Sequence, residues 1–187
     1  MSETTDGRNA RDRVSFLRTL RAVRSFRSDP VPQEVVDDVL EVARWSGSAS
    51  NKQPWEMVLI REQDTLRSLA SVGGYAGHLA GAPLGIVLIM AGERAEQETY
   101  DEGRLAERIM LAAHAHGVGS SIGWIVGPGR DAARKLLGIP QEKVVRTAIS
   151  LGYPDEEARR SRAGRGRARK PLGEIDYEER CRWENHE

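Results

Sequence analysis

Two spacings of apolar residues recur along this chain of 187 residues. Residues 35–45 place valine, leucine and alanine at positions i, i+1, i+4, i+5 and i+8, which is typical of a helix with a wide apolar face. Helical spacing also marks residues 13–21, 64–72, 100–116 and the interior of 127–138. Nearly continuous apolar runs at residues 56–61, 84–90 and 144–152 instead predict buried strands. The pattern predicts one domain of ordinary size that contains both helices and strands.

The two ends of the chain lack such spacing. Residues 1–12 are polar and are expected to form a mobile tail. Residues 159–170 contain seven basic residues in twelve, interspersed with glycine and alanine, as in a disordered basic arm. Nucleic acid is the first ligand that this arm suggests, but no aromatic residue stands between the charges to stack on a base. The formal net charge is zero, so no nucleic acid partner is expected.

Composition excludes several other classes of protein. The mean hydropathy is −0.53, and the longest apolar run, residues 84–91, is far shorter than the ~18 residues of a membrane span. No apolar segment like that of a signal peptide is present, so the cytoplasm is the expected compartment. Cys181 is the only cysteine, and the histidines show no metal-binding spacing. We expect no metal site. His78, in a glycine-rich loop, could reach a substrate, but we favour its interpretation as a surface histidine.

A short polar stretch connects the helix predicted at residues 35–45 to the first strand. It reads Ser-Ala-Ser-Asn-Lys-Gln-Pro-Trp over residues 48–55. Ser48, Asn51 and Gln53 could together offer donors and acceptors to the edge of a planar heterocycle, because polar loops on a rigid scaffold often carry binding groups. The alternative is a helix-to-strand connection that is rich in turn-forming residues.

Two other stretches carry candidate chemistry. Arg24 and Arg27 flank the hydroxyl of Ser25 just after a predicted helix, and a fork of fixed guanidinium donors suits phosphate. A solvated pair of arginines is the alternative. The glycine-rich residues 117–124 follow a helix and precede a strand, which is the reverse of the dinucleotide-binding fingerprint. A Rossmann fold is therefore excluded.

The residue order in these stretches resembles that of a known family. Residues 47–55 resemble the Pro-Ser-x-x-Asn-x-Gln-Pro-Trp signature of the nitroreductase family of flavin enzymes, with Gly47 in the place of proline. Residues 24–27 resemble the family's Arg-Ser-x-Arg segment, with Val23 where a further arginine is common. Three further motifs follow in the family's order: the turn at residues 117–124, a Leu-Gly-Tyr-Pro ending and a Pro-Leu-x-Glu motif. The resemblance extends from Val14 to Trp183.

This resemblance implies an α+β fold with a central mixed or antiparallel sheet flanked by helices. It implies a single domain over residues 1–187, built as a homodimer in which the tail within residues 159–187 crosses to the partner. It also implies bound FMN. The residues expected to hold FMN are Arg24, Ser25 and Arg27 at the phosphate, Ser48, Asn51 and Gln53 at the ring, the backbone of Ile122 and Gly123 near atom N5, and Arg167 and Arg169 as further phosphate ligands.

The expected activity follows from the same resemblance. We see no paired nucleophile and base in the sequence, so we expect no catalytic side chain and assign the chemistry to the flavin. We expect an FMN-dependent oxidoreductase that takes hydride from NAD(P)H and reduces nitroaromatic, quinone or similar acceptors by a ping-pong mechanism. The alternatives are a dehalogenase or flavin-modifying relative, a deazaflavin enzyme, and a non-catalytic flavin-binding protein. The sequence leaves the physiological substrate open, and also the choice between NADH and NADPH.

Overall fold

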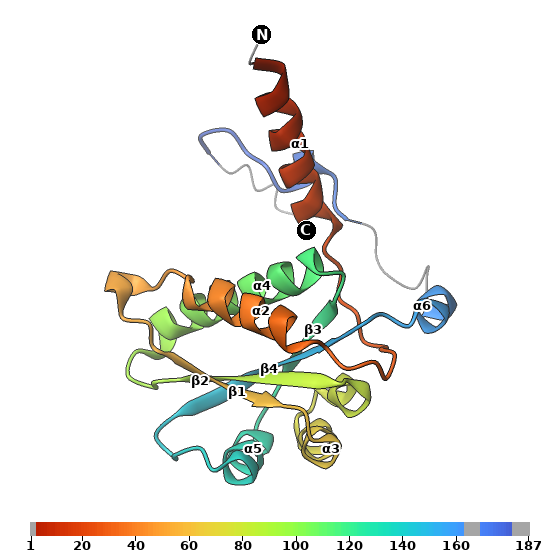
Figure 1. Ribbon diagram of the computed structural model, residues 1–187. Helices are drawn as coiled ribbons and strands as arrows, with labels where there is room; N and C mark the ends of the chain where they lie inside the picture. The colour runs from red at the N-terminus through yellow and green to blue at the C-terminus, as the bar shows by residue number, and fades with distance from the viewer. Residues whose placement is uncertain (1–2, 163–168, 181–187) are drawn as a thin grey trace, which may run out of the picture.

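The computed structural model describes residues 3–162 and 169–180 (Figure 1). The α-helices are α1 (Glu3–Thr19), α2 (Gln33–Arg44), α3 (Gln63–Val72), α4 (Ala95–Ala115), α5 (Gly129–Leu137) and α6 (Glu156–Arg162). The strands are β1 (Trp55–Ile60), β2 (Leu84–Met90), β3 (Gly119–Trp124) and β4 (Val144–Gly152). Single turns of 3₁₀-helix form η1 (Ala49–Asn51), η2 (Gly77–Gly81) and η3 (Leu172–Glu174). No helix in these residues is long and apolar enough to span a membrane.

The four strands form one antiparallel sheet in the order β1-β2-β4-β3. Strands β2 and β4 lie at the centre, and seven consecutive residues of β2 are buried. Along β2, Leu84, Ile86 and Leu88 belong to one apolar cluster and Val87 and Ile89 to another, because successive side chains of a strand point to opposite faces. Both faces of the sheet are therefore covered.

Helices cover the two faces in pairs (Figure 1). Helices α2 and α4 lie on one face, where Val36, Val39, Leu105 and Ile109 pack in the same cluster as Ile86. Helices α3 and α5 lie on the other face and contribute Leu66, Leu69 and Ala133. The result is an α+β fold with three layers, which confirms the predicted fold class and its antiparallel form of the sheet.

Most predicted elements occur within a few residues of their expected ends, but three expectations were wrong. Helix α1 begins at Glu3, so most of the predicted tail over residues 1–12 is helical. The stretch predicted as a glycine-rich turn contains a fourth strand, β3, at the edge of the sheet. Residues 159–162 of the predicted disordered arm continue helix α6.

The two ends of the described chain lie outside the layered body. Helix α1 projects away from the sheet, and the segment at residues 169–180 runs near it (Figure 1). The helix is attached at its C-terminal end, where the ring of Phe16 stacks on His114 at 5.0 Å and Thr19 Oγ1 lies 2.8 Å from His114 Nε2. Leu17 remains 54% exposed and Leu172 71% exposed. The rest of the tail predicted to cross to a partner lies outside the described residues.

Candidate functional site

The polar loop at residues 48–53 has an unusual backbone. Ser50, Asn51 and Gln53 have φ angles of 53°, 54° and 49°. Residues other than glycine rarely adopt this left-handed conformation, which costs of order 1–3 kcal/mol each and persists only where the surroundings impose it. Such strain is typical of functional sites, so the loop is the first candidate region.

Hydrogen bonds within the loop hold this conformation. Ser48 Oγ accepts the backbone N–H of Gln53 at 2.8 Å. The side-chain amide of Gln53 donates to the backbone carbonyl and side-chain oxygen of Asn51, each at 3.3 Å. The three residues predicted as ring ligands therefore lie together and support one another. We call residues 48–53 the strained loop.

Helix α4 fixes the strained loop from the side of the core. The side chain of Asp101 is buried, and its Oδ2 accepts the backbone N–H of Ala49 at 3.3 Å. Arg104, one turn later, lies 3.7 Å from Asp101 and covers Gly47 closely enough that a side chain at position 47 would displace it. Glycine in the place of proline therefore leaves room for the Arg104 guanidinium.

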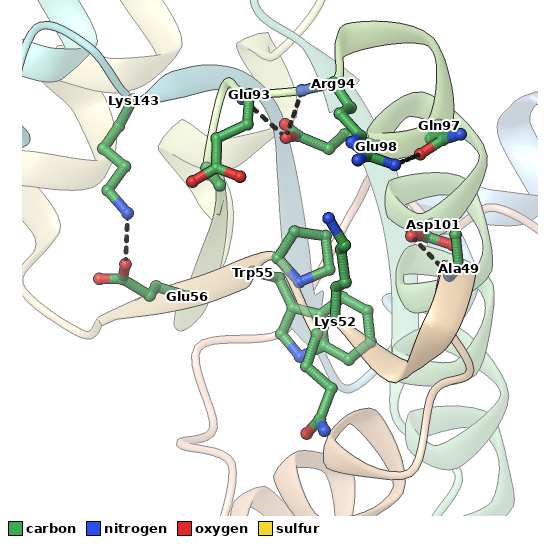
Figure 2. A pocket seen from close by; sticks show the side chains of 13 residues that line it. Ala49, Lys52, Trp55, Glu56, Glu93, Arg94, Gln97, Glu98, Asp101 and Lys143 are labelled. Carbon is green, nitrogen blue, oxygen red and sulfur yellow. Dashed lines mark hydrogen bonds and ion pairs between the residues drawn. The ribbon is translucent and has the colours of Figure 1, made fainter.

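A hollow of about 410 Å³ adjoins the strained loop (Figure 2). Pro54 and Trp55 line it on one side, and the first turns of α4 on the other. Lys143 and Glu56 form an ion pair of 2.9 Å at its margin. Burial raises the pKa of Glu98, but backbone N–H groups of residues 92–94 outweigh burial by donating to its carboxylate, so its pKa lies below the ordinary value. Glu98 and the Lys143–Glu56 pair are therefore satisfied within the protein, while Lys52 and Glu93 also line the hollow.

The outer edge of β3 forms the second candidate region. The carbonyl of Ser120 accepts the N–H of Val23 at 2.8 Å, and the carbonyl of Trp124 accepts the N–H of Tyr75 at 3.1 Å. Neither donor belongs to β4, so the even-numbered residues of β3 direct their backbone groups away from the sheet. The N–H of Ile122 therefore points outward. The N–H of Gly123 faces β4, and a Cβ at that position would lie 2.8 Å from Ala76 Cβ.

A hollow of about 660 Å³ is lined by the turn at residues 74–81, which bonds to this edge through Tyr75 and His78. Arg24 and Ser25 line it, together with residues of the 74–81 turn and with Asp155 and Ala158. Among the described residues Arg24 has no ion pair, whereas the carboxylate of Asp155 already accepts the N–H groups of residues 157 and 158, each at 3.1 Å. The hollow therefore holds one exposed guanidinium that is available to an anion. We call it the Arg24 hollow.

The other arginines predicted at a phosphate lie elsewhere. Arg27 does not line the Arg24 hollow, and it pairs with Asp29 at 3.4 Å and stacks on the ring of Tyr153 at 5.3 Å. Arg169 lines a separate hollow of about 810 Å³ between α1 and α4, with Arg18 and Arg21. Arg167 lies outside the described residues. Among the predicted phosphate ligands that the structure describes, Arg24 and Ser25 are the two that line one hollow.

His78 departs from the interpretation favoured for it, that of a surface histidine. It lines the Arg24 hollow, and it is half-buried rather than a free surface histidine. Its Nδ1 lies 2.7 Å from Ser150 Oγ, and its Nε2 lies 3.3 Å from the carbonyl oxygen of Ile122. Its place in a glycine-rich turn just before a buried strand was the only signal in the sequence, and that signal does not reveal the neighbouring strand edge.

The two candidate regions lie at opposite edges of the sheet. The strained loop leads directly into β1, and the Arg24 hollow is lined by the 74–81 turn, which bonds to the outer edge of β3. Three interstrand spacings separate β1 from β3, which amounts to roughly 14 Å. Among the described residues, no group of three or more histidine, cysteine or acidic side chains could hold a metal ion.

The fold and the two candidate regions are those of a layered α+β protein, and comparisons with known proteins define the family. The family model of the nitroreductase family matches residues 17–72 and 68–153. A protein of Archaeoglobus fulgidus named as an NADH dehydrogenase/NAD(P)H nitroreductase is 31% identical over 153 residues, covering 77% of this chain and 86% of its own. Nitroreductase NfnB of Mycolicibacterium smegmatis is 27% identical over 207 residues, covering 83% and 87%.

A solved structure agrees with these relatives. An FMN-dependent nitroreductase from Clostridium difficile superposes with a TM-score of 0.73 at 26% identity, covering 76% of this chain and 87% of that one. The chain belongs to the nitroreductase family. It is therefore an oxidoreductase by class, as the sequence predicted.

Proposed function

We propose that this protein is an FMN-dependent oxidoreductase that takes hydride from NAD(P)H and passes it to a nitroaromatic, quinone or similar acceptor. The observation that carries the proposal is the Arg24 hollow beside an outward-facing backbone amide of β3. The hollow supplies a cation with no ion pair among the described residues, and the nearby edge of β3 supplies an outward-facing donor; together they suit a ligand with an anionic end and a hydrogen-bonding ring.

The residues of this hollow fit the phosphate end of FMN. A guanidinium with no ion pair among the described residues can donate two parallel hydrogen bonds to a phosphate. The Ser25 hydroxyl lies in the same hollow and adds a further donor. We propose Arg27 and Arg169 as outer ligands, since each would have to leave its present neighbours to reach the same phosphate.

The donors for the ring come from two places. The N–H of Ile122 is the outward-facing group beside the hollow, and it takes the role expected of residues 122 and 123 near atom N5. Ser48, Asn51 and Gln53 take the role at the rest of the ring, in a loop whose strained shape is already formed. When bound, FMN supplies the hydride-accepting chemistry that the side chains lack. The protein orients the ring and stabilises negative charge on it.

We propose that the active form is a homodimer. The strained loop and the Arg24 hollow lie at opposite edges of one sheet, and a second copy could place its loop against the hollow of the first. The exposed apolar residues of α1 and of the segment at residues 169–180 support this proposal, because contact with a partner would cover them. Sedimentation of the purified protein with and without FMN tests it, and a monomer that binds FMN with full affinity would contradict it.

An absorption spectrum and an anaerobic titration test the oxidoreductase proposal. The purified protein should carry or take up one FMN per chain, and its visible absorbance should bleach with NADH or NADPH. Reoxidation by a quinone or a nitroaromatic after removal of the nucleotide would support ping-pong turnover. A flavin spectrum that neither nucleotide bleaches would contradict the proposed donor, and a protein that refuses FMN would contradict the proposed cofactor.

A further inference from the structure

The imidazole of His78 is held between two strands. Ser150, on the central strand β4, is completely buried, and its Oγ lies 2.7 Å from Nδ1. The carbonyl oxygen of Ile122, on the outer edge of β3, lies 3.3 Å from Nε2. The ring therefore ties the turn at residues 74–81 to the part of the edge where the Ile122 N–H points outward.

These contacts select one form of the ring. A carbonyl oxygen can only accept, so Nε2 must carry a hydrogen, and Nδ1 can then accept the hydroxyl hydrogen of Ser150. In this form the imidazole is neutral and both nitrogens are satisfied. A second proton on Nδ1 would force the Ser150 hydroxyl to turn its hydrogen toward the carbonyl of Ser121, at 3.5 Å.

The charges around the ring oppose its protonation. Burial lowers the pKa of His78, and the nearby charge of Arg24 lowers it further, against the hydrogen bond to Ile122. The other titratable groups that line the same hollow are Asp155 and Tyr75. The carboxylate of Asp155 is engaged by the backbone of α6, so it is directed to that helix rather than to the imidazole.

We propose that His78 is a positioning residue of the Arg24 hollow with two states. Neutral, it holds the edge of β3 so that the Ile122 N–H stays open to the ligand; protonated, it adds a second cation beside Arg24 for an anionic ligand. The inference rests on the proposed function in taking FMN as that ligand. An opposite charge within about 4–6 Å favours the charged form of a histidine, so binding of FMN and protonation of His78 assist each other.

The first test measures FMN affinity for the full chain by flavin fluorescence at pH 8 and pH 5.5, in the wild type and in His78→Gln. Glutamine keeps a donor and an acceptor but cannot take the proton. The ratio of the dissociation constant of His78→Gln to that of the wild type should be near one at pH 8 and should rise as the pH falls to 5.5, to at most about tenfold, since a shift of one pKa unit corresponds to a factor of ten. Taking the ratio cancels the titration of the FMN phosphate itself.

A matched control is His116→Gln, because His116 pairs with Asp38 at 3.0 Å and does not line the hollow. This variant should follow the wild type at both pH values. A ratio for His78→Gln that is the same at pH 8 and pH 5.5 would overturn the proposal.

The second test needs no variant, and its first part needs no flavin. Nitrogen NMR of the apoprotein should show His78 as the Nε2–H form, titrating below the ordinary histidine range. In FMN-loaded protein the titration should move upward by about one unit. A free imidazole with mixed tautomers in the apoprotein would overturn the proposal even if FMN binds. A protein that binds no FMN but shows the held Nε2–H form would instead contradict the proposed cofactor and retain the His78 assignment.

Discussion

The strained loop and the Arg24 hollow differ in how their polar groups are engaged when no ligand is bound. In the loop, the side chains of Ser48, Asn51 and Gln53 bond to one another or to the loop backbone, and left-handed residues fix its shape before any ligand arrives. In the hollow, the guanidinium of Arg24 has no ion pair among the described residues, and the Ile122 N–H points away from the sheet.

This difference separates two sources of affinity. The strained backbone of the loop lowers the folding stability of the protein. Because the shape of the loop is already fixed, less conformational entropy is lost when a ligand binds. The hollow keeps a guanidinium without an ion pair among the described residues, and a charge-assisted hydrogen bond to such a group is about twice as strong as a neutral one. Substitutions in the loop should therefore change stability and affinity together, whereas substitutions in the hollow should change affinity with little effect on stability.

Arg24→Ala should have the largest effect. We expect FMN affinity to fall by ~10- to 100-fold, because a hydrogen bond to a charged group contributes about 1.5–3 kcal/mol, while the free energy of unfolding stays close to that of the wild type. Fluorescence titration and urea unfolding measure the two quantities. Arg27→Ala is the matched control and should cost less affinity, because Arg27 is engaged by Asp29 and Tyr153. Equal losses of FMN affinity in the two variants would contradict the distinction drawn between Arg24 and Arg27.

Ser48→Ala should have an intermediate effect on both quantities. It removes the oxygen that accepts the Gln53 N–H, so we expect a loss of ~1 kcal/mol in the free energy of unfolding and an FMN affinity several-fold weaker. Urea unfolding of the apoprotein and flavin titration of the same samples provide the measurements. Unchanged stability combined with weaker binding would mean that Ser48 acts on the ligand directly and not through the shape of the loop.

Ser50→Gly should stabilise the protein. Glycine adopts a φ of 53° without the strain of a side chain, so we expect the free energy of unfolding to rise by up to ~1 kcal/mol. Ser68→Gly in the interior of α3 is the matched control, and it should lower stability by ~0.5–1 kcal/mol. A loss of stability in both variants would show that the loop is not strained at Ser50.

The smallest expected effect is the dependence of stability on pH at His78. Its pKa in the folded protein is below the ordinary value of an unfolded chain, so folding favours the neutral form. That contribution is complete above the unfolded pKa and is lost as the pH falls through the folded pKa. Urea unfolding of the apoprotein should therefore show that the free energy of unfolding falls more between pH 7.5 and pH 5.5 in the wild type than in His78→Gln. Parallel losses would mean that the histidine is solvated.

Local sequence pattern was sufficient for the elements that bury an apolar face. Strands β1, β2 and β4 and helices α2 to α5 were expected near their observed positions, because helical and strand spacing reports directly which side chains face a core. Strand β3 was missed because glycines and serines fill it, and its pairing with β4 depends on residues 20 or more positions later. Helix α1 was predicted too short because its first turns are polar and carry no apolar spacing.

The same division applies to the site. The sequence by itself determined the family, the polar loop and the pairing of Arg24 with Ser25, since these depend on the identity and order of neighbouring residues. Only the tertiary structure decided that Arg27 turns to Tyr153, that the Ile122 N–H faces outward and that His78 reaches Ser150, 72 residues later in the chain. The physical reason is that strand pairing and the packing of a turn on a sheet edge set which groups remain free. No spacing along the chain records which edge a distant residue will meet.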